Sequence, residues 1–269
     1  MNNFFELFAY EFFQKAFIAA VFASISCGII GSYIVSRRIV FISGGITHAS
    51  FGGIGLAFLL GFSPILGAVI FAVASALGIQ FFTKVARIRE DSSIAIFWSL
   101  GMALGIIFVF MTPGYTPNLM SYLFGNILTV TVAELIWMFI LNVVIIFFFS
   151  VFFREILYVA FDEEFAKAAG LPVSLINYLI ITLVALTVVL NIRVVGIILI
   201  LSLLTIPQAI ANLFTKKFKN LLLLSSFFAF TGTIIGLYVS YFLDIPSGAT
   251  IIFTLVVMFG LLKLYKYFF

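Results

Sequence analysis

Long apolar runs separated by short polar breaks repeat along the whole chain. Each run is about 20 residues long, the length that an α-helix needs to cross a hydrocarbon core about 30 Å thick. Backbone groups in lipid must find partners within their own segment, so the runs predict helices, and the short alternating strands of a membrane barrel are absent. The pattern predicts nine spans, at about 14–36, 42–61, 64–83, 92–111, 131–153, 173–191, 194–214, 221–243 and 249–266.

The segments between the spans carry turn signals. Residues 1–13 are mixed polar and aromatic and predict an interfacial lead-in, and residues 112–118 (TPGYTPN) predict a proline-punctuated loop. The stretch 121–128 (SYLFGNIL) is apolar but too short to span, which indicates a re-entrant or surface-lying piece. Pro207 falls inside the seventh span and predicts an interruption there.

The loop charges predict an orientation, with the N-terminus outside and the C-terminus in the cytoplasm. In this arrangement the outer side keeps only Lys15 and Arg193. The cytoplasmic side collects the other basic residues: Arg37, Arg38, Lys84, Arg87, Arg89, Arg154, Lys167, Lys216, Lys217, Lys219, Lys263 and Lys266. One crossing more or fewer would scatter these clusters over both faces.

Composition agrees with this pattern. The 269 residues are 64% hydrophobic and only 9% charged, whereas a soluble domain has about 25% charged residues. The net charge of +4 comes from small clusters between spans, so it does not indicate nucleic-acid binding. A single cysteine, Cys27, excludes an internal disulfide. We expect an all-α polytopic membrane protein with one transmembrane domain, residues 1–269, in contact with membrane lipids.

The second predicted span contains His48, the only histidine of the chain. An ionisable side chain at membrane depth is costly and is expected to face protein or water. Small residues recur every four positions beside it and predict close packing of a neighbouring helix: Gly45, Ala49, Gly53 and Ala57. His48 lies on an adjacent face with Gly44, Gly52 and Gly55, which could line a path. The alternative is a histidine hydrogen-bonded to a carbonyl of a neighbouring helix.

The acidic residues argue against two function classes. None of the ten lies at the middle of a predicted span, whereas ion-coupled carriers usually need intramembrane carboxylates or broken-helix ion sites. The chain lacks H-E-x-x-H, a G-x-S-x-G serine site and a G-x-x-x-x-G-K-[ST] phosphate loop. We therefore expect a protein that is not an enzyme and that takes any energy it uses from elsewhere.

The most polar stretch, FDEEFAKAAGLPV (161–173), predicts a short amphipathic helix on the cytoplasmic side. Asp162 is a candidate N-cap, and Glu163 and Glu164 suit the first turn. Gly170 is a stop signal. The apolar face comprises Phe165, Ala168 and Ala169. Such a helix could fit a socket on a peripheral partner; the alternative is an ordinary solvated loop helix.

These stretches together resemble the permease subunits of the zinc/manganese/iron-uptake branch of ABC importers, the ZnuB-, MntB- and TroC-like family. Residues 36–61 are similar to its arginine-flanked segment ending in G-D-x-x-x-H-A, and 161–173 to its D-x-E-x-A-x-x-x-G-L-P-V coupling segment. Residues 193–215 are similar to its V-G-x-x-L-x-x-x-L-L-x-I-P-A-A-x-A helix, and 122–128 to its F-G-x-I-L element.

The resemblance implies a multi-pass protein of the bacterial plasma membrane, working as a homodimer with a path at the subunit interface. A separate ATPase subunit would bind and hydrolyse ATP, and an extracellular or periplasmic metal-binding protein would deliver a divalent ion, so no cofactor is bound permanently. His48 would contact the passing ion. The ATPase would dock on the helix at about 162–170, through Asp162, Glu163, Glu164, Ala168 and Gly170.

The chain departs from the family pattern one helical turn before the histidine. The pattern has an aspartate there, whereas this sequence has Gly44, and only the neutral oxygens of Ser43 and Thr47 lie nearby. Imidazole alone suits zinc, copper or nickel better than manganese, which favours carboxylate-rich sites. The residues therefore favour zinc as the cargo, with manganese or iron as other candidates.

Two further functions stay open at this point. One is a permease for a metal chelate of the siderophore or cobalamin type, and the other is a non-transporting membrane scaffold. The scaffold predicts no ATPase partner and no phenotype on metal starvation.

Overall fold

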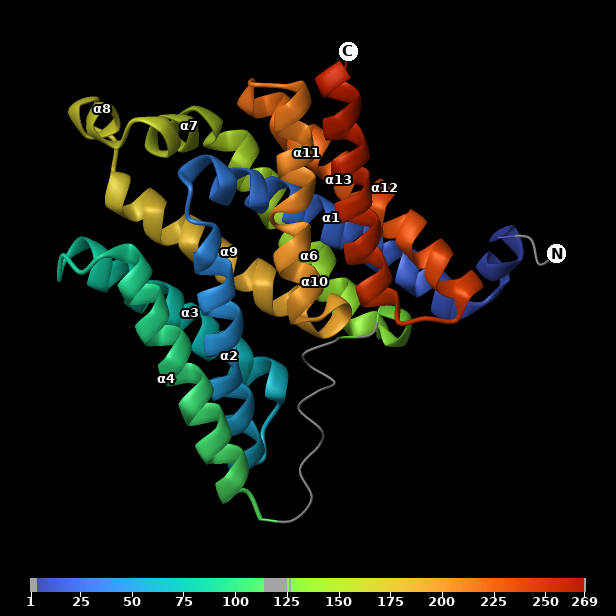
Figure 1. Ribbon diagram of the computed structural model, residues 1–269. Helices are drawn as coiled ribbons and strands as arrows, with labels where there is room; N and C mark the ends of the chain where they lie inside the picture. The colour runs from blue at the N-terminus through green and yellow to red at the C-terminus, as the bar shows by residue number, and fades with distance from the viewer. Residues whose placement is uncertain (1–3, 114–124, 126, 269) are drawn as a thin grey trace. The chain divides into compact units, whose positions relative to one another are not determined.

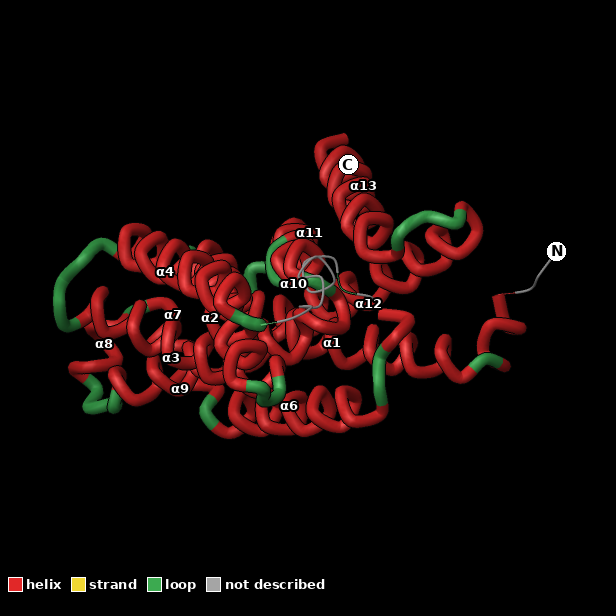
Figure 2. The backbone as a smooth tube through the Cα atoms, turned by 90° about the horizontal axis from the view of Figure 1, so that it is seen from below, coloured by secondary structure: helices red, strands yellow, loops and turns green. Residues whose placement is uncertain are grey.

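The computed structural model describes residues 4–113, 125 and 127–268, and every regular element in these ranges is a helix (Figure 1). Figure 2 shows these helices joined by short loops. Within the described ranges, nine helical segments are long and apolar enough to cross a membrane: Glu11–Arg37, Val40–Leu60, Pro64–Lys84, Glu90–Met111, Val132–Val151, Val173–Ile192, Ile197–Phe214, Phe218–Leu243 and Ser247–Phe268. The predicted all-α class and the nine spans are confirmed.

The chain divides into two compact units. The first comprises Met1–Arg38, Met120–Val151 and Asn191–Phe269, and the second comprises Ile39–Leu119 and Phe152–Leu190. The long helix α9 (Val173–Val195) is shared between them.

The first unit is built around α1 (Glu11–Arg37). This helix packs against α12, α6, α11, α10 and both short 3-10 helices. The packing is close because small residues line it: a methyl group added at Gly28 would overlap Ser226 of α12. One turn further on, the Ser32 hydroxyl donates to the Gly28 carbonyl at 2.7 Å and lies 3.1 Å from the Ser225 hydroxyl. The other elements of this unit are η1 (Phe4–Ala9), η2 (Ile127–Thr129), α6 (Val132–Val151), α10 (Ile197–Leu203), α11 (Ile206–Phe214), α12 (Phe218–Leu243) and α13 (Ser247–Phe268).

The second unit is built around α2 (Val40–Leu60), which packs against α3 (Pro64–Lys84) and α4 (Glu90–Met111) (Figure 1). Gly53 of α2 meets the backbone of Gly67 in α3 so closely that neither position has room for a Cβ. Close approach of this kind compensates for the missing hydrophobic drive between helices in lipid. Two short helices complete the unit, α7 (Phe153–Phe161) and α8 (Glu163–Ala168).

The predicted interruption near Pro207 is present, and a buried side chain donates a hydrogen bond to a carbonyl that the break leaves without its helical partner. The helix stops at Leu203 and resumes at Ile206, because proline lacks the N–H that would donate to the Leu203 carbonyl. Gln208 supplies a replacement donor: its Nε2 lies 3.1 Å from that carbonyl and 2.8 Å from the Cys27 carbonyl of α1. Gln208 is fully buried, and its amide N–H groups give the Leu203 carbonyl the donor that Pro207 lacks, whereas its Oε1 has no partner among the described residues.

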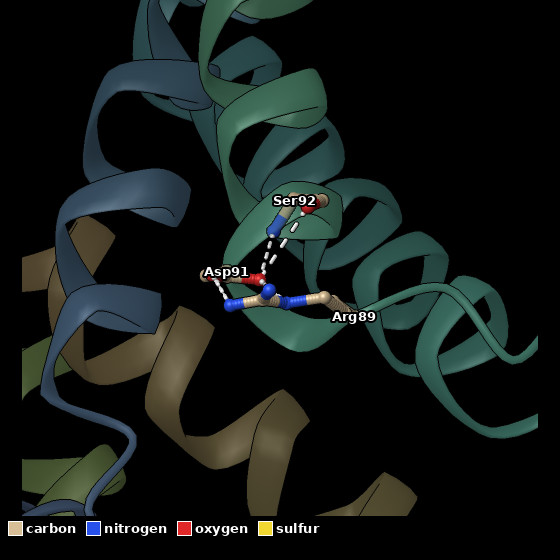
Figure 3. A network of polar contacts seen from close by, with 3 residues as sticks. All are labelled: Arg89, Asp91 and Ser92. Atoms are coloured by element: carbon tan, nitrogen blue, oxygen red, sulfur yellow. Dashed lines mark hydrogen bonds and ion pairs between the residues drawn. The ribbon is translucent and has the colours of Figure 1, made fainter.

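The first turn of α4 carries an ion pair (Figure 3). The Arg89 guanidinium donates to both carboxylate oxygens of Asp91, at 3.2 and 2.7 Å, and the Ser92 N–H donates to the same carboxylate at 2.8 Å. An acidic side chain suits this helix end because it faces the unpaired N–H groups of the first turn.

The structure differs from the sequence-based expectation in two places. The polar stretch 154–172 contains two helices, α7 and α8, where the pattern predicted one; α7 forms because Ile156, Val159 and Ala160 bury one face of it. The turn between the sixth and seventh spans lies at Gly196, whose φ of 81° ends α9 after Val195, so the expected loop at 192–193 is helical. Most of the predicted loop at 112–118 and of the re-entrant piece at 121–128 lies outside the described residues.

Candidate metal path and coupling helix

His48 lies in the middle of α2, and its imidazole stacks on the indole ring of Trp98 in α4. The ring centroids are 4.1 Å apart, and the ring planes differ by 9°. The histidine is partly exposed and Trp98 is 36% exposed. Nδ1 of His48 is buried, and within the part of the chain that the structure describes it has no hydrogen-bond partner. Among the described residues, His48 therefore makes no hydrogen bond through Nδ1 to a carbonyl of a neighbouring helix.

The small residues of α2 face two neighbours. A Cβ at Gly45 would lie 2.6 Å from the Ile94 side chain, and Ala49 meets the backbone at Gly101, both on α4. Gly53 meets Gly67 on α3. These three positions, together with Ala57, thus occupy the interfaces within the second unit.

The prediction that Gly52 and Gly55 form an open face beside His48 is wrong. A Cβ at Gly52 would lie 2.6 Å from the Phe71 ring, and one at Gly55 would lie 2.5 Å from the Gly105 carbonyl oxygen. These positions are filled because α3 and α4 pack against both sides of the glycine-rich helix. Gly52 and Gly55 are therefore covered by neighbouring helices and do not line an open face.

The hydroxyls expected to assist His48 are engaged within their own helix. Ser43 and Thr47 are fully buried. The Ser43 hydroxyl donates to the Val40 carbonyl at 2.7 Å, and the Thr47 hydroxyl donates to the Ser43 carbonyl. Among the described residues no group of three or more His, Cys, Asp or Glu side chains could hold a metal ion. The imidazole of His48 is thus the strongest metal ligand that α2 offers, and the residues next to it supply only neutral oxygen atoms.

The short helix α8 has the predicted boundaries. The Asp162 carboxylate accepts from the Phe165 N–H at 2.8 Å, which is the expected N-cap. At the other end Gly170 has a φ of 77°, its N–H donates to the Lys167 carbonyl, and the Leu171 N–H donates to the Ala166 carbonyl. This pair of bonds is a Schellman motif, which needs a residue with positive φ at the position of Gly170.

An ion pair joins α8 to the end of α3. Lys84 Nζ lies 2.8 Å from both carboxylate oxygens of Glu163. The helix therefore lies beside the basic end of α3. This agrees with the prediction that both segments lie on the same side of the membrane. Ala166 is buried, whereas Glu164, Ala168 and Gly170 are exposed, and Phe165 is 51% exposed and packs edge-on against Tyr158 of α7 at 5.3 Å. The exposed face of α8 thus combines the acidic Glu164 with the apolar Phe165 and Ala168.

Sequence reasoning missed several polar groups within the spans, because it looked for groups that titrate. Gln208 stands where the family pattern has an alanine. Asn142 of α6 donates to the Phe22 carbonyl of α1 at 3.1 Å, and Asn191 lies 3.4 Å from the Ser26 hydroxyl. A search for amides within apolar runs would have found all three. Trp98 gave no such signal, because an aromatic residue in a span is ordinary.

Comparison with known proteins decides the family. The model of the ABC 3 transport family matches residues 9–266. The chain belongs to this family. It is 36% identical over 253 residues to the manganese transport system membrane protein MntC of Listeria monocytogenes, covering 94% of this chain and 90% of that protein. It is 32% identical over 251 residues to the manganese import system permease protein ScaB of Streptococcus gordonii, covering 93% and 90%.

A solved structure extends the similarity to three dimensions. PsaBC from Streptococcus pneumoniae, solved in complex with a Fab, matches with a TM-score of 0.84 and 32% identity, covering 97% of this chain and 95% of that one. Together with the nine apolar helices, these matches identify the chain as a permease subunit of a metal-uptake ABC transporter. It is a multi-pass protein of the bacterial plasma membrane.

Proposed function

We propose that this permease imports a divalent transition-metal ion by alternating access, driven by ATP hydrolysis in a separate subunit. The observation that carries the proposal is the match over nearly the whole chain to two permeases named for manganese transport. His48 supports it as the ion's contact, because it is the only histidine of the chain, its imidazole lies within a span, and imidazole binds divalent transition metals. The chelate permease and the scaffold become the outcomes that the tests below would reveal.

Manganese is the first candidate cargo, because both relatives carry it in their names. Zinc is the second candidate, and a specific observation favours it: Gly44 leaves the imidazole without a carboxylate one turn away, and the Ser43 and Thr47 hydroxyls are neutral. A cargo site should be weak in either case, since the ion must leave it again.

Uptake measurements distinguish these cargoes. A strain lacking this gene, with and without a plasmid copy, is assayed for accumulation of radiolabelled manganese and zinc under metal limitation. We expect the plasmid to restore accumulation of one ion, with the other competing only at higher concentration. Restored uptake of a metal–siderophore complex and of neither free ion would replace the proposal with a chelate permease, and no restored uptake of any of them would favour a scaffold.

The partners follow from the same proposal. Two copies of the chain would form the path, an extracellular or periplasmic metal-binding protein would deliver the ion, and a cytoplasmic ATPase subunit would dock on α8. The docking role is supported by the exposed face of Glu164, Phe165 and Ala168, and by the anchoring of α8 through Glu163 to Lys84. An anchored helix can pass motion from an attached ATPase to the end of α3.

Substitutions on this face test the docking. Glu164→Lys combined with Ala168→Trp should prevent co-purification of the ATPase and abolish metal-dependent ATP turnover, because the face would have the wrong charge and shape. Lys219→Glu is the matched control, a charge reversal at an exposed position outside α8, and should leave both unchanged. Normal ATPase binding and turnover in the double variant would remove α8 from the coupling mechanism.

A further inference from the structure

Few side chains of its own helix lie beside His48. Of the four positions one turn away from it on α2, three are glycine: Gly44, Gly45 and Gly52. Side chains at these positions are the ones that meet a residue on the same helix face. The fourth is Phe51, so within α2 the imidazole has at most one side chain beside it on this face.

Trp98 supplies the missing neighbour from α4. Its indole is parallel to the imidazole within 9°, at a centroid distance of 4.1 Å. The two helices are in close contact on both sides of the ring pair: Gly45 packs against Ile94 before it, and Ala49 and Gly52 pack against Gly101 after it. Because these contacts fix the spacing of α2 and α4 here, the backbone of Trp98 is held beside that of His48.

The stack constrains the ring without using its donor atoms. The lone pair with which an imidazole nitrogen binds a metal lies in the ring plane, whereas Trp98 covers a ring face. A hydrogen bond to a carboxylate or carbonyl would hold the ring through one of its nitrogens. No such bond to Nδ1 is present among the described residues.

We propose that Trp98 is the positioning residue of the cargo site, holding the imidazole of His48 in the plane from which it meets the passing ion. This proposal rests on the proposed function, since it assigns Trp98 a role at the same site. Trp98 acts through His48 and does not itself contact the ion. Stacked aromatic pairs contribute modestly, so the expected loss on removing the indole is about two- to tenfold in apparent affinity.

Transport kinetics in the full transporter provide the first test. Trp98→Leu should raise the KM for the imported ion about two- to tenfold with a smaller change in maximal rate, and Trp98→Phe, which keeps a stacking ring, should recover most of the affinity. A Trp98→Leu protein present in the membrane at normal level with an unchanged KM would overturn the proposal.

Fluorescence gives a second readout that does not depend on how well Trp98→Leu folds. The chain has two tryptophans, Trp98 and Trp137, so Trp137→Phe leaves Trp98 as the only indole. In the transporter purified with its ATPase, the emission of Trp98 is the difference from the same complex carrying Trp98→Phe as well. Adding Mn²⁺ or Zn²⁺ should change this difference, and His48→Ala in the same background should remove the change. Emission that is insensitive to both ions, or equally sensitive without His48, would overturn the proposal.

The two proposals fail differently. If His48→Ala abolishes uptake while Trp98→Leu transports with normal KM, only the positioning role is lost. If His48→Ala itself transports normally, the cargo site on which the positioning role depends is lost as well.

Discussion

At the residue scale, the proposed cargo site is a single imidazole in neutral surroundings. The residue one turn earlier is a glycine, and the nearby hydroxyls of Ser43 and Thr47 donate to backbone carbonyls of α2. Such a site has borderline nitrogen chemistry and lacks the hard, charged oxygen that manganese prefers. Selectivity in this permease should therefore respond to a single added carboxylate.

Gly44→Asp tests this. The new carboxylate would lie one turn from His48 on the same helix face, and we expect the ratio of manganese to zinc uptake to rise severalfold. Gly44→Asn is the control of equal size without the charge, and it should leave the ratio close to that of the unmodified protein. An unchanged ratio in a Gly44→Asp protein of normal membrane level would show that position 44 does not face the ion.

His48 could be predicted as a candidate from the sequence, because one ionisable residue within an apolar run is conspicuous. Its partner could not. The chain has 36 phenylalanines, 10 tyrosines and two tryptophans, and nothing in their spacing distinguishes Trp98. The stack exists because α2 and α4 pack glycine to backbone at a particular register, which is a property of two helices together.

At the scale of elements, the small residues of α2 allow its neighbours to pack closely against it. Gly53 and Gly67 meet backbone to backbone, Ala49 meets Gly101 of α4, and Gly45 meets the Ile94 side chain of α4. In lipid such contacts carry the association that burial of apolar surface provides in water. Substitutions in this seam should therefore affect stability before they affect transport chemistry.

A pair of glycine-to-alanine substitutions checks this. Gly53→Ala forces its Cβ against the Gly67 carbonyl and should destabilise the purified protein by about 1–3 kcal/mol. Gly260→Ala, in α13, adds a Cβ where no atom lies within 4 Å and should be neutral or slightly stabilising. The measurement is thermal unfolding in detergent, and equal melting temperatures for the two variants would contradict the packing account.

Helix boundaries followed from the sequence where the termination signals are local. Asp162 and Gly170 delimit α8 as expected, through an N-cap and a residue with positive φ. The helix α7 was missed because its buried face is short and lies in a polar stretch. The two bonds made by Gln208 could not be predicted either, since they depend on where the break at Leu204 and Thr205 lies against α1.

At the scale of the whole molecule, nine spans and an uneven distribution of basic residues predict one orientation in the membrane. The number of spans follows from apolar length alone, which is why the sequence predicted it. The orientation stays a prediction from the charge rule, by which the loop after α11 would lie in the cytoplasm and the turn after α12 outside.

Cysteine labelling measures the orientation. Cys27 is buried and is the only cysteine, so Cys27→Ala gives a background for single cysteines at exposed positions. Ile245→Cys should react with a membrane-impermeant maleimide on intact cells, and Lys217→Cys should react only after permeabilisation. The reverse pattern would place α8 on the outer face and exclude docking of a cytoplasmic ATPase there.

The most direct test of the central claim is uptake by His48→Ala. Accumulation of the radiolabelled ion is compared in the deletion strain carrying the unmodified gene, the His48→Ala gene or an empty plasmid, normalised to the permease present in the membrane. We expect His48→Ala to fall to the level of the empty plasmid while its amount in the membrane and its ATPase binding stay normal. Uptake equal to that of the unmodified protein would contradict the account.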